Sequence, residues 1–223
     1  MIGWVVGASG TWGGAVGREI LERGFDLVAL GRTEPADLAT RAAKLGRCFT
    51  FVHLDLASSD EERSPVVAAA LAVSVPDVLV VASAATSVPR ASLAQTNYLA
   101  PAGLIEQVAE AMRGRGSGRI GVFVGQNARL GMAGAGEFSA SQAALWTWCE
   151  GLQDELRREG KVSLTRVIPP RAASRTQAYL AVRSGHQARL HAPKAGPLVA
   201  AILAGKRHAG RRPILAALAM MAR

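Results

Sequence analysis

The chain has 223 residues, of which 49% are hydrophobic and 5% aromatic, so it can bury one sizeable core, and residues 1–223 are expected to form a single domain. The sequence has only two cysteines and no basic leader, which argues against a disulfide-rich secreted protein. It has no apolar run as long as a membrane span, which argues against an integral membrane protein. We therefore expect a cytoplasmic protein. The net charge of +9 favours the binding of anionic partners.

Short apolar runs alternate with amphipathic stretches along the first 170 residues. Six runs rich in Val, Ile, Leu or Phe are predicted strands: Ile2–Val6, Asp26–Leu30, Cys48–Leu54, Asp77–Val81, Arg119–Val124 and Val162–Ile168. The predicted helices between them are Gly13–Arg23, Pro35–Leu45, Asp60–Val73, Ser92–Met112 and Phe138–Arg158. Thr33 is expected to cap the second helix, with Pro35 in its first turn. The alternation predicts an α/β fold: a single Rossmann-like, doubly wound parallel sheet with helices on both faces.

The pattern changes after Ile168. Two prolines end the last predicted strand, and residues 171–191 are polar, basic and without a clear period, which is typical of a lid. Short helices near Pro197–Ala204 and Pro213–Met221 are predicted to close the chain. Residues 160–223 carry twelve Lys or Arg and no acid. Such a segment attracts phosphates, anionic lipid, nucleic acid or an acidic carrier protein, and a solvated arginine-rich surface explains it equally well. We favour a carrier protein over nucleic acid.

The stretch GASGTWG, residues 7–13, follows the first predicted strand and opens the first predicted helix. Glycines at Gly7, Gly10 and Gly13 allow a tight turn and a close approach of the backbone to a pyrophosphate at the helix N-terminus. Ser9 and Trp12 lie in the same loop. The stretch therefore predicts a dinucleotide-binding loop.

Three residues at the ends of later strands extend this predicted cofactor site. Arg32 follows the second strand, where a site that prefers NAD carries an acid, so a contact with a ribose 2′-phosphate favours NADP. A surface arginine is the alternative. Asp55, in HLDL, is placed to accept a hydrogen bond from an adenine amino group or to cap the next helix. Ala82 follows the fourth predicted strand and is the last of the predicted cofactor-binding residues.

The order of these motifs resembles that of the short-chain dehydrogenase/reductase family. From Gly7 to about Pro170, the stretches GASGTWG, LGRT, HLDL, QTNYLAP, GRIGVFVG, FSASQAAL and RVIPP fall in the family's order and near its spacings. The resemblance implies one Rossmann-type domain that binds NAD or NADP. It also implies pairing into dimers or tetramers through the helices Ser92–Met112 and Phe138–Arg158.

The family's catalytic residues are a serine after the fifth strand, a Tyr-x-x-x-Lys pair and an upstream asparagine. In this chain Gly125, Phe138 and Gln142 fall at the serine, tyrosine and lysine positions, and only Asn97 remains. Neither Phe138 nor Gln142 can transfer a proton near neutrality. Further departures are the stretch VASAAT, in place of the family's Asn-Asn-Ala-Gly, and the bulky Trp12 near the expected nicotinamide position.

The preferred hypothesis is a catalytically degenerate subunit that pairs with an active homologue or with itself. It resembles the inactive partner in reductase pairs of aminocoumarin-antibiotic pathways, which act on carrier-protein-bound amino acids. The second predicted interface helix offers an aromatic-rich packing face, for which core packing is the alternative: Leu145, Trp146, Trp148, Cys149, Leu152 and Leu156.

Two other functions fit the same residues. One is a stand-alone NADP-dependent oxidoreductase, or a non-redox cyclase or isomerase, that uses Gln126, Asn127 or Gln142. The amides of Gln126 and Asn127 can hydrogen-bond a substrate carbonyl, although they cannot protonate it at a useful rate. The other is a sensor that binds NADP and reports it to a partner.

Overall fold

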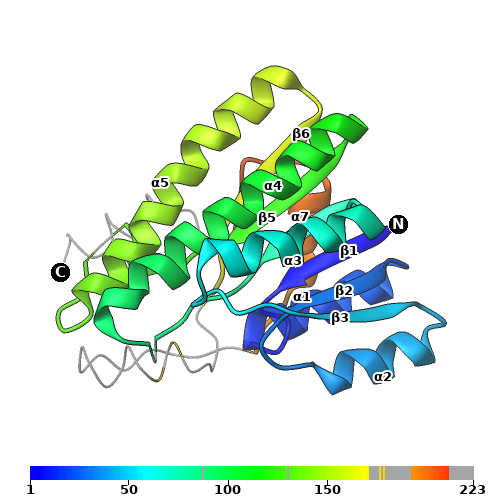
Figure 1. The fold of residues 1–223 in the computed structure, drawn as a ribbon, viewed down its shortest axis with the longest axis horizontal. Coiled ribbons are helices and arrows are strands. Elements are labelled where there is room, and N and C mark those ends of the chain that lie inside the picture. The colour runs from blue at the N-terminus through cyan, green and yellow to red at the C-terminus, as the bar shows by residue number, and fades with distance from the viewer. Residues whose placement is uncertain (87, 130, 171–175, 177, 179–191, 211–223) are drawn as a thin grey trace.

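The computed structural model describes residues 1–86, 88–129, 131–170, 176, 178 and 192–210. Within them a seven-stranded sheet is covered by helices on both faces (Figure 1). The sheet order is β3-β2-β1-β4-β5-β6-β7, and every neighbouring pair is parallel. The strands are β1 (Ile2–Val6), β2 (Asp26–Gly31), β3 (Phe49–His53), β4 (Val78–Val81), β5 (Gly118–Phe123), β6 (Val162–Ile168) and β7 (His208–Gly210). This architecture confirms the predicted fold class.

The seventh strand was not predicted. β7 has three residues in a polar run, and its first residue, His208, is exposed. Backbone pairing places it at the sheet edge, where His208, Ala209 and Gly210 align with residues 166–168 of β6. A strand of this kind carries no apolar pattern, because its place is set by pairing with a neighbour and not by burial.

The helices largely follow the predicted ranges. They are α1 (Thr11–Glu22), α2 (Ala36–Lys44), α3 (Asp60–Val73), α4 (Ala100–Arg115), α5 (Gly136–Glu159) and α7 (Gly196–Leu203). The predicted helix Ser92–Met112 is wrong in its first part, which consists of a 3-10 turn, η1 (Arg90–Ser92), and a π turn, η2 (Gln95–Leu99). Pro101 has no N–H to donate to the carbonyl of Asn97, so the regular hydrogen-bond ladder cannot run through this segment.

The predicted cap of α2 is also wrong. Pro35 is the N-cap, no side chain caps the helix, and Thr33 lies two residues before it. A residue that precedes proline is held in an extended conformation, so Glu34 cannot join the helix, and the helix begins after the proline ring.

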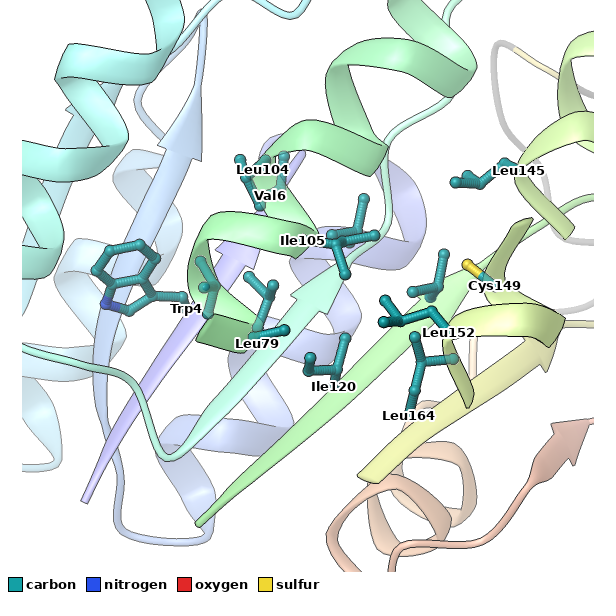
Figure 2. Close-up of a cluster of buried hydrophobic side chains, with 14 of the residues drawn as sticks. Trp4, Val6, Leu79, Leu104, Ile105, Ile120, Leu145, Cys149, Leu152 and Leu164 are labelled. Carbon is teal, nitrogen blue, oxygen red and sulfur yellow. The ribbon is translucent and has the colours of Figure 1, made fainter. Parts of the chain in front are cut away.

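Two apolar layers hold the sheet between the helices. On one face α3, α4 and α5 cover a large core cluster that includes Trp4, Leu79, Ile120 and Leu164 (Figure 2). On the other face α1, α2 and α7 cover a second cluster. Of the residues predicted to form an aromatic-rich packing face, Trp148 is partly buried and the others lie inside the first cluster: Leu145, Trp146, Cys149, Leu152 and Leu156. These side chains therefore serve the core.

Most of the predicted lid and the predicted helix Pro213–Met221 lie outside the described residues. Among the described helices, none combines the length and apolar character needed to cross a membrane.

Candidate functional site

The glycine loop lies at the point where the sheet order reverses, since β1 has β2 on one side and β4 on the other. Gly7 has a φ of +81°, a left-handed conformation that favours glycine. A Cβ on Gly13 would lie 2.0 Å from the carbonyl oxygen of Gly7. The loop therefore needs both glycines to bring the start of α1 close to the end of β1.

The N-terminus of α1 is open to an anion. Gly10 is the N-cap and has no side chain, and the first turn holds no acidic residue. Ser9 and Gly10 are exposed, whereas Gly13 is buried against the turn. Backbone N–H groups and the helix dipole at such an end suit a pyrophosphate, so the residues present fit the dinucleotide that the sequence predicts.

Trp12 connects the glycine loop to the end of β5. Its ring lies 6.0 Å from that of Phe123, with the planes tilted by 41°, and it packs on the second core cluster. Phe123 is the last residue of β5, so this contact holds the start of α1 beside the strand that precedes Gly125. Phe123 was not predicted to have a role, because a buried strand residue gives no functional signal in the sequence.

The other predicted cofactor residues lie at the same edge of the sheet. Arg32 directly follows β2 and is exposed. Asp55 follows β3, and its Oδ1 accepts a hydrogen bond from the N–H of Ala57 at 2.9 Å. Asp55 does not cap α3, because Ser59 does so in a reciprocal capping box with Glu62.

Ala82 follows β4 and donates its N–H to the carbonyl of Val6 at 3.0 Å, so it also lies at this edge. Because the carboxyl ends of parallel strands meet at one edge, Gly7, Arg32, Asp55 and Ala82 follow four neighbouring strands there.

Asn97 clamps the loop after β4. Its Oδ1 accepts from the N–H of Ala85 at 2.7 Å, and its Nδ2 donates to the carbonyl of Ala85 at 2.9 Å. The same Nδ2 donates to Oγ of Ser141 at 3.2 Å, and that hydroxyl donates to the carbonyl of Phe138 at 2.9 Å. The side chain that matches the family's asparagine thus ties the altered VASAAT stretch to α5. Ser141 was not singled out from the sequence.

Phe138 is buried, with 1% of its surface exposed. It belongs to a small apolar cluster with Leu93 and Ala135, and Val88 and Met132 pack against that cluster. The ring at the tyrosine position therefore contributes to packing, and it carries no hydroxyl that could move a proton.

Gln142, at the lysine position, turns toward Gly125. Its Oε1 accepts a hydrogen bond from the N–H of Gly125 at 2.9 Å, and its side chain is 1% exposed. A lysine has three donors and no acceptor, so it could not make this bond. The structure brings the lysine and serine positions together through a neutral contact.

A side chain at residue 125 would meet the tip of the Asn127 side chain. The backbone of Gly125 is extended (φ −69°, ψ 156°), a conformation that any residue adopts. A Cβ there would lie 2.1 Å from Oδ1 of Asn127, which belongs to the 3-10 turn η3 (Gln126–Ala128). The carboxamide of Asn127 therefore occupies the space that a serine side chain at residue 125 would need.

The sequence and the architecture are both similar to those of known proteins. A family model described as short chain dehydrogenase matches residues 2–183. A search of curated proteins gives no significant match. Similar solved structures include a short-chain dehydrogenase from Streptomyces avermitilis, with 22% identity over 99% of this chain and 93% of that one and a TM-score of 0.81.

Two further structures are similar at lower identity. A 3-oxoacyl-(acyl-carrier-protein) reductase from Agrobacterium tumefaciens C58, solved with NADP bound, is 16% identical over 92% of this chain and 87% of that one, with a TM-score of 0.75. YwfH, an NADPH-dependent reductase involved in bacilysin biosynthesis, is 16% identical over 93% and 94%, with a TM-score of 0.78. The chain belongs to the short-chain dehydrogenase/reductase family.

Proposed function

We propose that this chain is an NADP-binding, catalytically silent member of its family and acts as an accessory subunit of a ketoreductase. The observation that carries the proposal is the state of the four catalytic positions. Asn97 and Gln142 are hydrogen-bonded to backbone groups, Phe138 is buried, and Gly125 has no side chain. None of the four can donate a proton, and loss of general acid catalysis typically costs a factor of about 100 to 10,000.

Retention of the cofactor loop supports binding without catalysis. Gly7 and Gly13 keep the tight turn, and the N-terminus of α1 carries no acidic residue in its first turn. The reductase from Agrobacterium tumefaciens was solved with NADP bound, and YwfH is NADPH-dependent. When bound, NADP supplies hydride transfer; Gly7, Ser9, Gly10, Trp12, Gly13, Arg32, Asp55 and Ala82 would hold it.

The proposed substrate is bound to a carrier protein and belongs to secondary metabolism. A reductase of acyl-carrier-protein substrates and a reductase of bacilysin biosynthesis are among the structures that this chain resembles. The basic residues after Glu159 suit an acidic carrier protein. An active homologue with an intact Tyr-x-x-x-Lys pair would supply the chemistry.

The deciding experiment compares the chain alone with the chain co-expressed with an active family member that has an intact Tyr-x-x-x-Lys pair. NADPH oxidation is followed with carrier-bound carbonyl substrates. We expect no turnover by the chain alone, and co-purification with a higher rate for the pair than for the active member alone. Robust turnover by the lone chain would contradict the proposal.

Arg32 provides a test of the cofactor that does not need turnover. Arg32→Ser should weaken binding of NADPH about tenfold and leave NADH binding unchanged, because only NADPH carries the 2′-phosphate. Quenching of tryptophan fluorescence, to which Trp12 contributes, measures both affinities. Arg47→Ser, an exposed arginine before β3, is the control. Equal, weak affinity of the wild type for the two nucleotides would count against NADP.

A further inference from the structure

Three basic side chains lie around the indole of Trp146 on α5. The guanidinium carbon of Arg166, from β6, lies 4.4 Å from the centre of the indole ring, and that of Arg129, which follows η3, lies 5.9 Å from it. The imidazole of His208, from β7, stacks on the indole with ring centres 5.9 Å apart. Glu150, one turn further along α5, accepts a hydrogen bond from Nη2 of Arg166 at 3.0 Å. Four separate segments therefore bring three basic groups and one carboxylate together.

Arg166 is buried, with 2% of its surface exposed, and its hydrogen bonds are incomplete. Within the described part of the chain, Nη2 donates to Glu150 and, at 3.3 Å, to Gln153. Nε and Nη1 are buried as well, and neither has an acceptor among the described residues. Buried donors are normally satisfied, and the cost of leaving one unpaired is larger for a charged group. The guanidinium therefore indicates a place for a further acceptor.

The charges around the indole do not balance. Glu150 pairs with Arg166, and Asp154 pairs with Arg207 at 2.8 Å. No acid among the described residues forms an ion pair with Arg129, which is exposed. One positive charge is therefore left without a counter-ion beside the incomplete guanidinium.

The chemistry of these groups selects the ligand. The pKa of His208 is lowered from 6.5, mainly by burial, so the imidazole is neutral above pH 6.5 and adds no charge. A neutral carbonyl would leave the charge of Arg129 uncompensated, and a dianion would exceed it. An oxyanion with a single charge compensates it and offers lone pairs to the free N–H groups of Arg166. Carboxylates and phosphodiesters both have this chemistry.

The cluster reaches the surface at the edge of the sheet. Arg129 and His208 are exposed, and β7, which carries His208, is the last strand of the sheet. We propose that Arg129 and Arg166, held around Trp146, bind one singly charged oxyanion, a carboxylate or a phosphodiester. The site uses none of the four catalytic positions, so it goes beyond the proposed function and does not depend on it.

Two small oxyanions test the site in the full chain. Acetate represents a carboxylate, and dimethyl phosphate represents a phosphodiester. Each is titrated at neutral pH and constant ionic strength, and the indole ¹H–¹⁵N signal of Trp146 is followed by NMR. The loss of this signal in Trp146→Phe identifies it. We expect a saturable shift, and the oxyanion that binds more tightly identifies the source of the natural ligand.

Two variants change the charge of the cluster in opposite directions and keep Arg166 in place. Arg129→Gln removes the uncompensated charge and should weaken binding roughly tenfold. Glu150→Gln removes the acid that competes for Arg166, so it should strengthen binding. Arg157→Gln is the matched control, because the side chain of Arg157 is 65% exposed on the same helix. It should leave the affinity unchanged.

The inference is overturned if neither oxyanion gives a saturable shift in the folded wild type. It is also overturned if Arg129→Gln binds as tightly as the wild type, or if Glu150→Gln does not bind more tightly, while circular dichroism shows that both variants are folded. An equal loss of affinity in Arg157→Gln and Arg129→Gln would reveal a general attraction to the basic surface, and it would overturn the site as well.

Discussion

Helix α5 contributes to two buried polar regions of opposite character. Near its N-terminus, Gln142 accepts a hydrogen bond from Gly125, and the buried NH₂ groups of Gln142 and Asn127 have no acceptor among the described residues. Two turns later, the same helix covers Arg166 of β6, a full positive charge that is 2% exposed. The comparison shows that this fold can bury a cation under α5, so the absence of charge at the lysine position is local to that site.

The charged region holds its arginine with several partners. Nη2 of Arg166 donates to Glu150 at 3.0 Å and to Gln153 at 3.3 Å, and the guanidinium carbon lies 4.4 Å from the centre of the Trp146 ring. The hydrogen bond from Arg166 lowers the pKa of Glu150. The pKa of His208 on β7 is also lowered, mainly by burial and to a smaller extent by the positive charge of Arg166. Nε and Nη1 of Arg166 are buried without an acceptor among the described residues, so the polar partners of this buried charge all contact Nη2, and the Trp146 ring covers the guanidinium.

Arg166→Ala should produce the largest loss of stability. It removes the stacked guanidinium and the buried stem, and it leaves a cavity beneath α5, so we expect a loss of about 2–4 kcal/mol. The midpoint of urea unfolding measures it. Arg157→Ala is the control on the surface of α5. The Arg157 side chain is 65% exposed, and its Nε lies 3.9 Å from Oδ1 of Asp154. Its loss should lower the free energy of unfolding by less than about 0.5 kcal/mol. Equal losses of stability in the two variants would show that the buried contacts of Arg166 do not stabilise the fold.

Gly125→Ser tests the neutral region. The new Cβ would meet Oδ1 of Asn127, so we expect a loss of about 1–3 kcal/mol in the free energy of unfolding. In an Asn127→Ala background the same substitution should cost clearly less, because the obstructing side chain is gone. A double-mutant cycle from urea unfolding gives the coupling. Additive losses would show that Asn127 does not occupy the space of the serine side chain.

The pH dependence of stability should report the charged region. The pKa of Glu150 is lowered from 4.5 in the folded chain, so its ion pair with Arg166 stabilises the fold above pH 4.5, and this stabilisation is lost as the pH falls below that value. The stability advantage of the wild type over Glu150→Gln should therefore shrink in acid. If the difference in free energy of unfolding between the wild type and Glu150→Gln stays constant from pH 6 to pH 3.5, the ion pair between Glu150 and Arg166 does not stabilise the fold.

Restoring the catalytic pair should produce the smallest effect. Phe138→Tyr with Gln142→Lys is expected to leave NADPH oxidation at the level of the lone wild type. Gly125 still lacks the serine hydroxyl, the VASAAT loop remains, and the N–H of Gly125 loses its acceptor on Gln142. Recovery of substantial turnover would show that two substitutions alone silence the site.

The regular strands and helices could largely be predicted from their apolar runs and residue composition, whereas the irregular elements could not. β1 and β6 begin and end where Ile2–Val6 and Val162–Ile168 were predicted, and so does α3. β7 and the π turn before α4 were missed. A three-residue edge strand depends on its neighbour, and a π turn depends on how the chain accommodates a proline, and neither leaves a period in the sequence.

The sequence by itself determined which chemical groups are present at the catalytic positions: an amide, a phenyl ring and a glycine cannot transfer a proton wherever they lie. Only the tertiary structure decided what these residues do instead. Asn127, two residues beyond Gly125, fills the space of a side chain there, and Gln142 reaches the same glycine from another element. Sequence spacing cannot reveal such contacts, because they depend on how β5, its following turn and α5 approach one another in space.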